Sequence, residues 1–478
     1  MMTPTTEQTA ILSAATSSSS NLMINALAGT GKSTTLRLIE RAVSQRPMLY
    51  LAFNKRVVDA ICYRSGAPDR LSSTTTVRTF NSLGHRIWAQ AQGNLNLNAK
   101  KTGDILKSII DDAPKAKREA IWSIFHYITT SVAMAKAVGY VPEGKFPHAR
   151  RLTDLPTFIS LLDEEPDDFS LSLINTVLTH SITLAYAGTI DFNDQVYMPA
   201  LFGGTYPKFP IVAVDEFQDL NPVNHEMLRR LVTKRVIGVG DPWQNIYGFR
   251  GATASGMADA SAKFRMEPLT LSTSFRCPQA IVENARWRVP HFNWTKPGGY
   301  VETIPPGSVH SIPSDATVLC RNNAPLFRLA FHLLSSGVSV SVAGSDIGPK
   351  IVGILHRLGP ATLSRTATFG AIDLWLASRL AKKSRTAEDM ADCMRMFAGH
   401  GADLGQAISY AEFLFKQEGS IKLLTGHKAK GLEWPTVYIL DPWLIRDDEQ
   451  DLNLRYVMET RSMDKLFYID SSQFKGTT

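Results

Sequence analysis

The feature that most constrains the fold is a glycine-rich turn between an apolar run and a helical stretch. The apolar run covers residues 22–27, the turn covers 28–33, and the helical pattern spans 34–43. A second apolar run follows at 48–53. This strand–loop–helix–strand order predicts a parallel sheet that is covered by helices. Glycines in such a turn let backbone N–H groups point at phosphate oxygens, next to the positive end of the helix dipole.

The turn therefore predicts a phosphate site. Lys32 would reach the β- and γ-phosphates of a nucleotide, and the Ser33 hydroxyl would bind Mg²⁺. Ala26 stands where the strict phosphate-loop pattern has its first glycine. An ordinary glycine-rich turn has a similar sequence, so a second signal is needed to identify a nucleotide site. The residues expected to hold the nucleotide here are Ala28, Gly29, Thr30, Gly31, Lys32, Ser33 and Thr34.

A pair of carboxylates supplies the second signal. Asp215 and Glu216 follow the apolar residues 211–214, which predict a buried strand. Such a strand would bring Asp215 to Mg²⁺ and Glu216 to the attacking water. Two acids at a strand end are otherwise typical of a solvated turn. The apolar run before them and the phosphate loop upstream favour a nucleotide hydrolase.

Composition excludes several other classes of protein. The chain has 478 residues, 44% of them hydrophobic and 20% charged, which is typical of a globular protein with about three or four domain-sized units. It has no apolar run long enough to span a bilayer and no secretory signal, so we expect no membrane contact and a cytoplasmic location. The net charge of +7 is compatible with a polyanionic partner. The cysteines are scattered, which favours reduced core thiols over a zinc site: Cys62, Cys277, Cys320 and Cys393.

Two interrupted α/β domains account for the remaining pattern. Strand-like runs at 211–214 and 236–239 complete the first sheet, and a second set lies at 317–320, 338–342, 421–424, 437–440 and 466–469. The Pro/Gly clusters at 297–299 and 305–307 predict a surface loop. The predicted segments are 1–84 and 189–267 for the first α/β domain, 85–188 for its helical insertion, 268–347 and 419–478 for the second α/β domain, and 348–418 for a reduced helical insertion.

Longer motifs resemble the UvrD/Rep type of superfamily 1 DNA helicases. Residues 215–219 read Asp-Glu-Phe-Gln-Asp, and residues 240–252 continue the family pattern. The forms of two segments, 52–55 and 191–194, lean toward the subgroup that contains the F-box DNA helicases. Asn81 replaces the usual His, Ala52 the usual Thr, and Gly426 a larger residue. The other matching segments, in family order, are Gln8, 79–82, 274–276, 425–434 and 456–461.

The resemblance implies two RecA-like domains with ATP and Mg²⁺ in the cleft between them. It implies that Gln8 reads adenine, Phe275 stacks on adenine and Glu433 binds the ribose. Arg276 and Arg461, the latter on a helix facing the cleft, would stabilise the charge of the transferring phosphoryl group. The expected catalytic residues are Lys32, Asp215, Glu216, Gln244, Arg276 and Arg461, and the expected metal ligands are Ser33 and Asp215.

The resemblance also implies a groove for single-stranded DNA. Stacking on aromatic side chains tolerates any base, so we expect sequence-independent binding that weakens steeply with salt. Four aromatic residues are candidate platforms, of which one or two should be buried packing, and Phe249 has the strongest case because glycines flank it. The expected DNA-contacting residues are Phe53, Asn54, Lys55, Thr79, Phe80, Tyr247, Phe249, Arg250, Thr425, His427 and Lys428, with Phe53, Phe80, Tyr247 and Phe249 as the platforms.

The expected activity is an ATP-dependent helicase or translocase that moves on single-stranded DNA. The direction, 3′ to 5′, comes only from the resemblance. Expected partners are single-stranded DNA, junctions with duplex DNA, and a protein that loads the motor. The cytoplasmic location would be the nucleoid, or the host cytoplasm for a phage-encoded protein. Two alternatives stay open: an ATP-gated DNA-binding or sensing subunit of a larger complex, and an RNA helicase.

Overall fold

The computed structural model divides the chain into two compact units. One contains Met1–Ala26 and Gly31–Leu271, and the other contains Leu27–Thr30 and Ser272–Thr478. Each has a six-stranded parallel sheet with helices, as expected for two RecA-like domains, so the predicted α/β fold class is confirmed. The structure describes residues 4–52, 55, 58–59, 71–246, 248, 256–305, 312–343, 347–381, 384 and 386–474.

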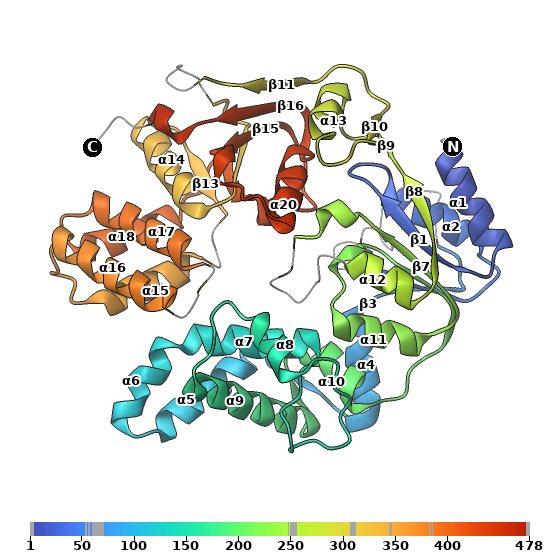
Figure 1. Cartoon of the computed structure of the whole chain (residues 1–478), viewed down its shortest axis with the longest axis horizontal. Helices are drawn as coiled ribbons and strands as arrows, with labels where there is room; N and C mark the ends of the chain where they lie inside the picture. Colours follow the sequence, from blue (N-terminus) through green and yellow to red (C-terminus); the bar gives the residue numbers. More distant parts are fainter. Residues whose placement is uncertain are drawn as a thin grey trace. The chain divides into compact units, whose positions relative to one another are not determined.

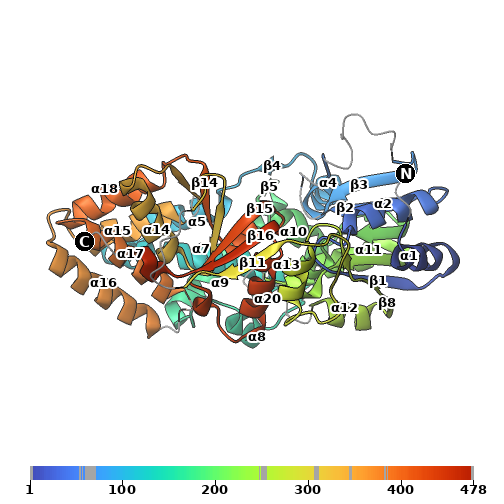
Figure 2. The same cartoon turned by 90° about the horizontal axis from the view of Figure 1, so that it is seen from above.

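The first sheet places three functional loops at one edge. Its strands follow the order β3-β2-β6-β7-β1-β8, and all neighbouring pairs are parallel. Figure 1 shows β1 beside β7, and Figure 2 shows β2 beside β3. The loops after β1, β6 and β7 therefore all leave the carboxyl edge, where ligands of such sheets bind. The bounds are β1 Asn21–Ala26, β2 Met48–Ala52, β3 Thr75–Thr79, β6 Phe209–Val214, β7 Val232–Gly240 and β8 Met266–Leu271.

Side chains alternate between two cores on opposite faces of this sheet. Leu22 and Ile24 of β1 pack in a core with helices α1 (Thr6–Ser17) and α2 (Lys32–Ala42). Met23 faces the other core, which continues without interruption into the helical insertion. One of the two cores of the first unit is therefore shared by the sheet and the helical insertion.

The helical insertion begins inside a helix. α4 spans Phe80–Gln92 and is capped by Thr79, so the predicted boundary between residues 84 and 85 falls within one continuous helix. The insertion continues with β4 Asn96–Leu97, α5 Lys101–Asp112, α6 Lys115–Ser123, α7 Phe125–Val138, α8 Leu155–Ser160 and α9 Asp168–Tyr186. The chain returns through β5 Thr189–Ile190 and α10 Asp194–Phe202, and later forms η1 Phe217–Asp219, α11 Pro222–Leu231, η2 Pro242–Gln244 and α12 Gly256–Lys263.

The second unit repeats the parallel architecture. Its large sheet has the order β11-β16-β15-β12-β14-β13, and a two-stranded sheet pairs β9 with β10. The strands are β9 Thr273–Ser274, β10 Asn293–Trp294, β11 Tyr300–Thr303, β12 Thr317–Cys320, β13 Val340–Val342, β14 Ile421–Thr425, β15 Trp434–Leu440 and β16 Ser462–Ile469. Its helices outside the helical block are α13 Gln279–Ala285, α14 Asn323–Ser335, α19 Gly426–Ala429, α20 Glu449–Glu459, η4 Pro442–Leu444 and η5 Ser471–Phe474.

The region predicted as a reduced insertion, 348–418, forms a block of helices in the second unit (Figure 1). The block shares a core with α14 and the large sheet. The four helices are α15 Gly348–Leu358, α16 Arg365–Leu380, α17 Ala387–His400 and α18 Leu404–Leu414.

Among the strands of the two large sheets, β3, β8 and β11 were not predicted from the sequence. β8 pairs with β1, so the first unit extends to Leu271 rather than ending at the predicted residue 267. β11 pairs with β16 and lies between the two Pro/Gly clusters that predicted a single loop. All three are edge strands, which tolerate polar and proline residues, so their sequences give no apolar run.

In the described part of the chain, no helix combines the length and the apolar character that crossing a membrane requires. Cys277, Cys320 and Cys393 are buried free thiols, whereas Cys62 lies outside the described residues.

Candidate functional site

The phosphate loop leaves the first turn of α2 open to an anion. Gly29 and Gly31 have left-handed backbone angles, with φ of 72° and 83°. Gly31 caps α2 without a side-chain hydrogen bond, and Ser33 and Thr34 are exposed in the first turn. The Lys32 ammonium donates to the Ala26 carbonyl at 3.4 Å. Backbone donors, a helix N-terminus and a cation thus occur together, which fits a phosphate group.

Residues 27–30 of this loop belong to the second unit and contact its segment 274–276, which contains Arg276. Ser274 Oγ donates to the Ala28 carbonyl at 3.0 Å, and the Ala28 N–H donates to Tyr456 Oη at 3.1 Å. A Cβ on Gly29 would lie 2.5 Å from Arg276 Cβ, so only glycine fits there. The Thr30 hydroxyl donates to the Leu27 carbonyl at 2.8 Å and helps to close the turn.

The acid pair lies at the end of β6, on the same sheet edge as the phosphate loop. Asp215 is 4% exposed, and its N–H donates to the Leu51 carbonyl at 3.0 Å. The Tyr50 hydroxyl donates to Asp215 Oδ2 at 3.1 Å. Burial and the neighbouring Glu216 carboxylate raise the pKa of Asp215 to about 7, against the opposing effect of Lys32. Two adjacent carboxylates, one of them buried, fit a bound divalent cation, and exposed Ser33 offers a further oxygen ligand.

A hydrogen-bonded chain joins Glu216 to Gln244. Glu216 has a left-handed backbone with φ of 50°, a conformation that costs energy for a non-glycine residue and is common at functional sites. Gln218 Nε2 donates to Glu216 Oε2 at 2.6 Å, and Gln218 Oε1 accepts from the Asp241 N–H at 3.0 Å. Gln244 Nε2 then donates to Asp241 Oδ2 at 2.7 Å. The loops after β6 and β7 are thereby connected by three hydrogen bonds, one of which uses the Asp241 backbone N–H.

Gln8 has protein partners at both ends of its carboxamide. It is 6% exposed, its Oε1 accepts from the Thr5 N–H at 3.0 Å, and its Nε2 donates to Thr35 Oγ1 at 3.1 Å. These two bonds use one of the two Oε1 lone pairs and one of the two Nε2 N–H groups, so an adenine-reading role does not require either bond to break. That role stays a prediction.

Within the second unit, Arg276 forms an ion pair with Glu433. The Arg276 side chain is 25% exposed and that of Glu433 is 46% exposed. Phe275 is half-buried, and its N–H donates to the Gly29 carbonyl at 2.9 Å. The predicted ribose-binding acid therefore neutralises the predicted phosphate-binding arginine in this structure.

Arg461 differs from its prediction, because it does not lie on a helix. α20 ends at Glu459, and Arg461 occupies the turn before β16, where it is 1% exposed. Its guanidinium donates to the Val457 carbonyl at 2.9 Å and to the Leu432 carbonyl at 3.2 Å. Arg461 is buried beyond the end of α20 because the C-terminus of a helix leaves carbonyl groups without helical partners, and the guanidinium donates hydrogen bonds to such groups.

The segment at the start of α4 that is predicted to contact DNA presents polar rather than aromatic groups. Phe80 is 6% exposed and packs in the core that the first sheet shares with the helical insertion, so the platform predicted at Phe80 is buried packing. Thr79 is occupied as the cap of α4. Asn81, which replaces the usual His, donates from Nδ2 to the Phe192 carbonyl at 2.6 Å. Lys55 is exposed.

The corresponding motif of the second unit surrounds α19. Thr425 is 8% exposed at the end of β14, and Lys428 donates to the Ala343 carbonyl at 2.6 Å. Burial, with the nearby Arg321, lowers the pKa of His427 to about 4. His427 is therefore neutral at pH 7 and would act as a hydrogen-bonding group rather than as a cation.

Comparison with known families decides the identity of this arrangement. Residues 6–265, more than half of the 478, match the family model described as the UvrD/REP helicase N-terminal domain. The chain belongs to the UvrD/REP helicase family. Residues 420–469 of this UvrD/REP family member match a second model, the UvrD-like helicase C-terminal domain. The predicted family is confirmed.

Several curated proteins are similar to this UvrD/REP family member. F-box DNA helicase protein 1 of Schizosaccharomyces pombe is 22% identical over 98% of this chain and 57% of its own length. The probable DNA helicase II homolog of Mycoplasma genitalium is 24% identical over 53% of this chain and 38% of its own length. RecBCD enzyme subunit RecB of Mycolicibacterium smegmatis is 38% identical over 16% of this chain and 7% of its own length. The chain thus spans little more than half the length of the first of these relatives and less of the others.

Some residues predicted for this UvrD/REP family member lie outside the described part of the chain, and other important ones were missed. Those outside are Phe53, Asn54, Tyr247, Phe249 and Arg250. Those missed are Tyr50, Gln218 and Phe192, the last being 54% exposed. Tyr50 is a polar hydroxyl at the centre of an apolar strand, which is a signal that the sequence does contain.

Proposed function

We propose that this chain is an ATP-driven motor that moves along single-stranded DNA, 3′ to 5′, and separates duplex DNA at junctions. One observation carries the proposal: the phosphate loop after β1 and the acid pair after β6 leave the same edge of one parallel sheet. Family membership supports the coupling of this ATPase site to DNA. The direction rests on the family resemblance alone.

The proposed chemistry uses the residues of the first unit in distinct roles. Lys32 and the N–H groups of the first turn of α2 bind the phosphates, and Glu216 takes the proton of the attacking water. Ser33 and Asp215 would hold Mg²⁺, which when bound neutralises phosphate charge. The hydrogen-bonded chain from Glu216 to Gln244 connects the loop after β7 to the proposed general base. A movement of that loop would therefore shift the position of the Glu216 carboxylate.

We assign the second unit two functions. Arg276 and Arg461 stabilise the charge of the transferring phosphoryl group, with Phe275 and Glu433 binding the nucleoside. Thr425, His427 and Lys428 contact the DNA backbone, together with Lys55 and Thr79 of the first unit. Phe192 is an exposed aromatic residue that was not among the predicted DNA-contacting residues, and it provides a further platform on which a base can stack. The RecB relative is named as a subunit of an enzyme complex, which supports a protein partner that loads the motor.

A streptavidin-displacement assay tests the motor. Oligonucleotides carry biotin–streptavidin at either the 5′ or the 3′ end, and release is followed with and without ATP. We expect ATP-dependent release from the 5′ end. DNA-stimulated ATP hydrolysis without release from either end would instead identify an ATP-gated sensing subunit. Equal competition by RNA of the same sequence in the ATPase assay would contradict the choice of DNA.

The Tyr50 hydroxyl is expected to orient the metal-binding carboxylate. Its bond to Asp215 is a hydrogen bond to a charged group, which contributes about 1.5–3 kcal/mol. We therefore expect Tyr50→Phe to raise the Mg²⁺ concentration for half-maximal ATP hydrolysis by about tenfold, with a near-normal rate at saturating Mg²⁺. Tyr140→Phe is the matched control, because it removes the hydroxyl that donates to Asn175 Oδ1 in the helical insertion. An unaltered Mg²⁺ requirement in Tyr50→Phe would refute this role.

A further inference from the structure

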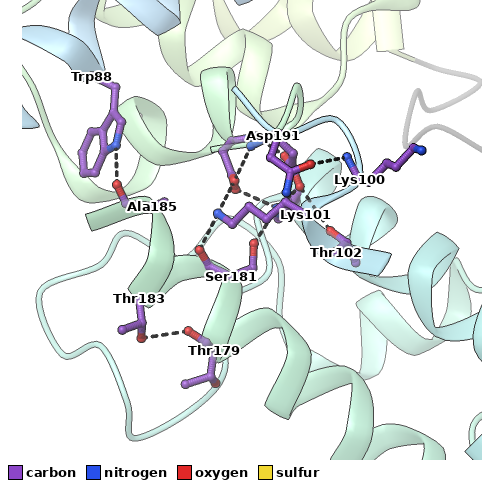
Figure 3. Close-up of polar contacts among 12 residues, drawn as sticks. Trp88, Lys100, Lys101, Thr102, Thr179, Ser181, Thr183, Ala185 and Asp191 are labelled. Atoms are coloured by element: carbon purple, nitrogen blue, oxygen red, sulfur yellow. Dashed lines mark hydrogen bonds and ion pairs between the residues drawn. The ribbon is translucent and has the colours of Figure 1, made fainter. Parts of the chain in front are cut away.

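The helical insertion contains a buried cluster of four charged side chains. Lys101 comes from α5 and Lys136 from α7, whereas Asp191 and Asp194 lie where the chain re-enters the first domain. The side chains of Lys101, Lys136 and Asp194 are fully buried, and that of Asp191 is 8% exposed. Figure 3 shows Lys101 directed toward Ser181 of α9, beside Asp191.

The contacts of the cluster are short and shared. Lys101 Nζ lies 2.6 Å from Asp194 Oδ2 and donates to the Ser181 carbonyl at 2.7 Å. Lys136 Nζ lies 2.6 Å from Asp191 Oδ2, 2.7 Å from Asp194 Oδ1 and 2.9 Å from Ser181 Oγ. Two positive and two negative charges cancel, so the cluster has no net charge with which to attract an ionic ligand. Its role is therefore within the protein.

The cluster fixes one tight turn. The Asp191 N–H donates to Asp194 Oδ2 at 2.9 Å, and the Asp194 N–H donates to Asp191 Oδ1 at 2.8 Å. Between these buried aspartates, Phe192 and Asn193 are exposed. The turn is also held from the other side, because Asn81 at the start of α4 donates to the Phe192 carbonyl. With these contacts in place, Phe192 is 54% exposed.

Stability alone is a weak reason for such a cluster. Burying charges costs desolvation energy, and well-packed apolar residues of similar volume are often equally stable or better. Charged pairs with several hydrogen bonds differ from apolar packing in being directional, so they specify one arrangement of the backbone that they hold. What they specify here is the position of residues 192–193.

We propose that Lys101 and Lys136 are positioning residues: from the helical insertion they clamp the 191–194 turn and hold Phe192 where a base of single-stranded DNA stacks on it. This inference rests on the proposed function and deepens it. It makes the insertion part of the DNA-binding machinery, acting from beneath the surface without touching DNA.

The test compares Lys136→Met with Phe192→Ala in the full chain, using fluorescence anisotropy of a labelled oligo(dT). Loss of one stacked base predicts that Phe192→Ala weakens binding by about tenfold. Lys136→Met should weaken it by a comparable factor. In the Phe192→Ala background, the same lysine substitution should add less than twofold. A purely structural lysine would not give this dependence on Phe192.

Controls separate positioning from loss of folding. Ile128→Ala removes a buried apolar side chain from the same helix without touching the turn, and it should bind oligo(dT) within twofold of the unmodified protein. If Lys136→Met does not fold, Lys136→Met/Asp191→Asn keeps the remaining charges balanced and takes its place, with the same expected loss. Circular dichroism and thermal melting verify the fold of each variant.

Each outcome decides between the two proposals. A folded lysine variant that binds oligo(dT) within twofold of the unmodified protein, or one whose defect is equally large without Phe192, overturns the clamp. If the unmodified protein neither binds oligo(dT) nor hydrolyses ATP faster with it, the proposed function itself fails. DNA-stimulated hydrolysis by the unmodified protein, combined with an unaffected lysine variant, overturns only the clamp.

Discussion

Glu216→Gln is expected to lower the rate of DNA-stimulated ATP hydrolysis by about 10²–10⁴-fold, the usual contribution of a positioned general base. Gln preserves the size of the side chain and its contact with Gln218 but cannot accept a proton. Steady-state hydrolysis with saturating oligo(dT) measures the effect. Binding of ATP and of DNA should persist, because the substitution leaves the phosphate loop and the segments proposed to contact DNA unaltered.

Glu267→Gln is the matched control for this variant. Glu267 is an exposed glutamate on β8 of the same sheet, and its substitution should leave hydrolysis within twofold of the unmodified protein. If the Glu216→Gln variant hydrolyses ATP at more than a tenth of the rate of the unmodified protein, Glu216 is not the general base.

Arg276→Ala is expected to reduce the rate of hydrolysis by about 10³-fold or more, because arginines that stabilise the transferring phosphoryl group contribute about 10³–10⁵ in rate. Arg276 is the better of the two arginines to test. Arg461 is buried and holds three carbonyl or hydroxyl groups, so its loss would mix folding with chemistry. Arg276 is partly exposed, and Glu433 keeps access to water when its partner is removed. Single-turnover hydrolysis measures the chemical step.

The control for Arg276 is Arg288→Ala. Arg288 also belongs to the second unit and also forms an ion pair, with Glu449, but no role in chemistry is assigned to it. Its loss should alter hydrolysis by less than twofold. Equal effects of the two substitutions would mean that Arg276 contributes a surface ion pair and no stabilisation of phosphate charge.

The sequence was most informative where function depends on local spacing. The phosphate loop needs glycines between a strand and a helix, and the acid pair needs an apolar strand directly before it. These patterns predicted β1, α2 and β6 within one or two residues of their observed ends. The helical block at 348–418 was likewise visible from its periodicity.

Contacts between distant segments could not be predicted in the same way. Phe80 looks like a platform in its motif, yet α4 turns its ring into the core. Gln8 meets Thr35, 27 residues away, and Lys101 meets Asp194, 93 residues away. Sequence alone predicts that a lysine is exposed, because a charged side chain is buried at low cost only when a partner compensates its charge. Here that partner lies far away in the sequence. The family resemblance supplied motifs but no such pairings.

The core that the first sheet shares with its helical insertion has a consequence for how the first unit unfolds. Val212 on the sheet and Leu178 in α9 belong to one packed cluster of buried apolar residues. Heat or denaturant should therefore melt this half of the molecule in one cooperative step. The insertion cannot be excised as an autonomous module, since cutting it away would expose the apolar face of the sheet on which it rests.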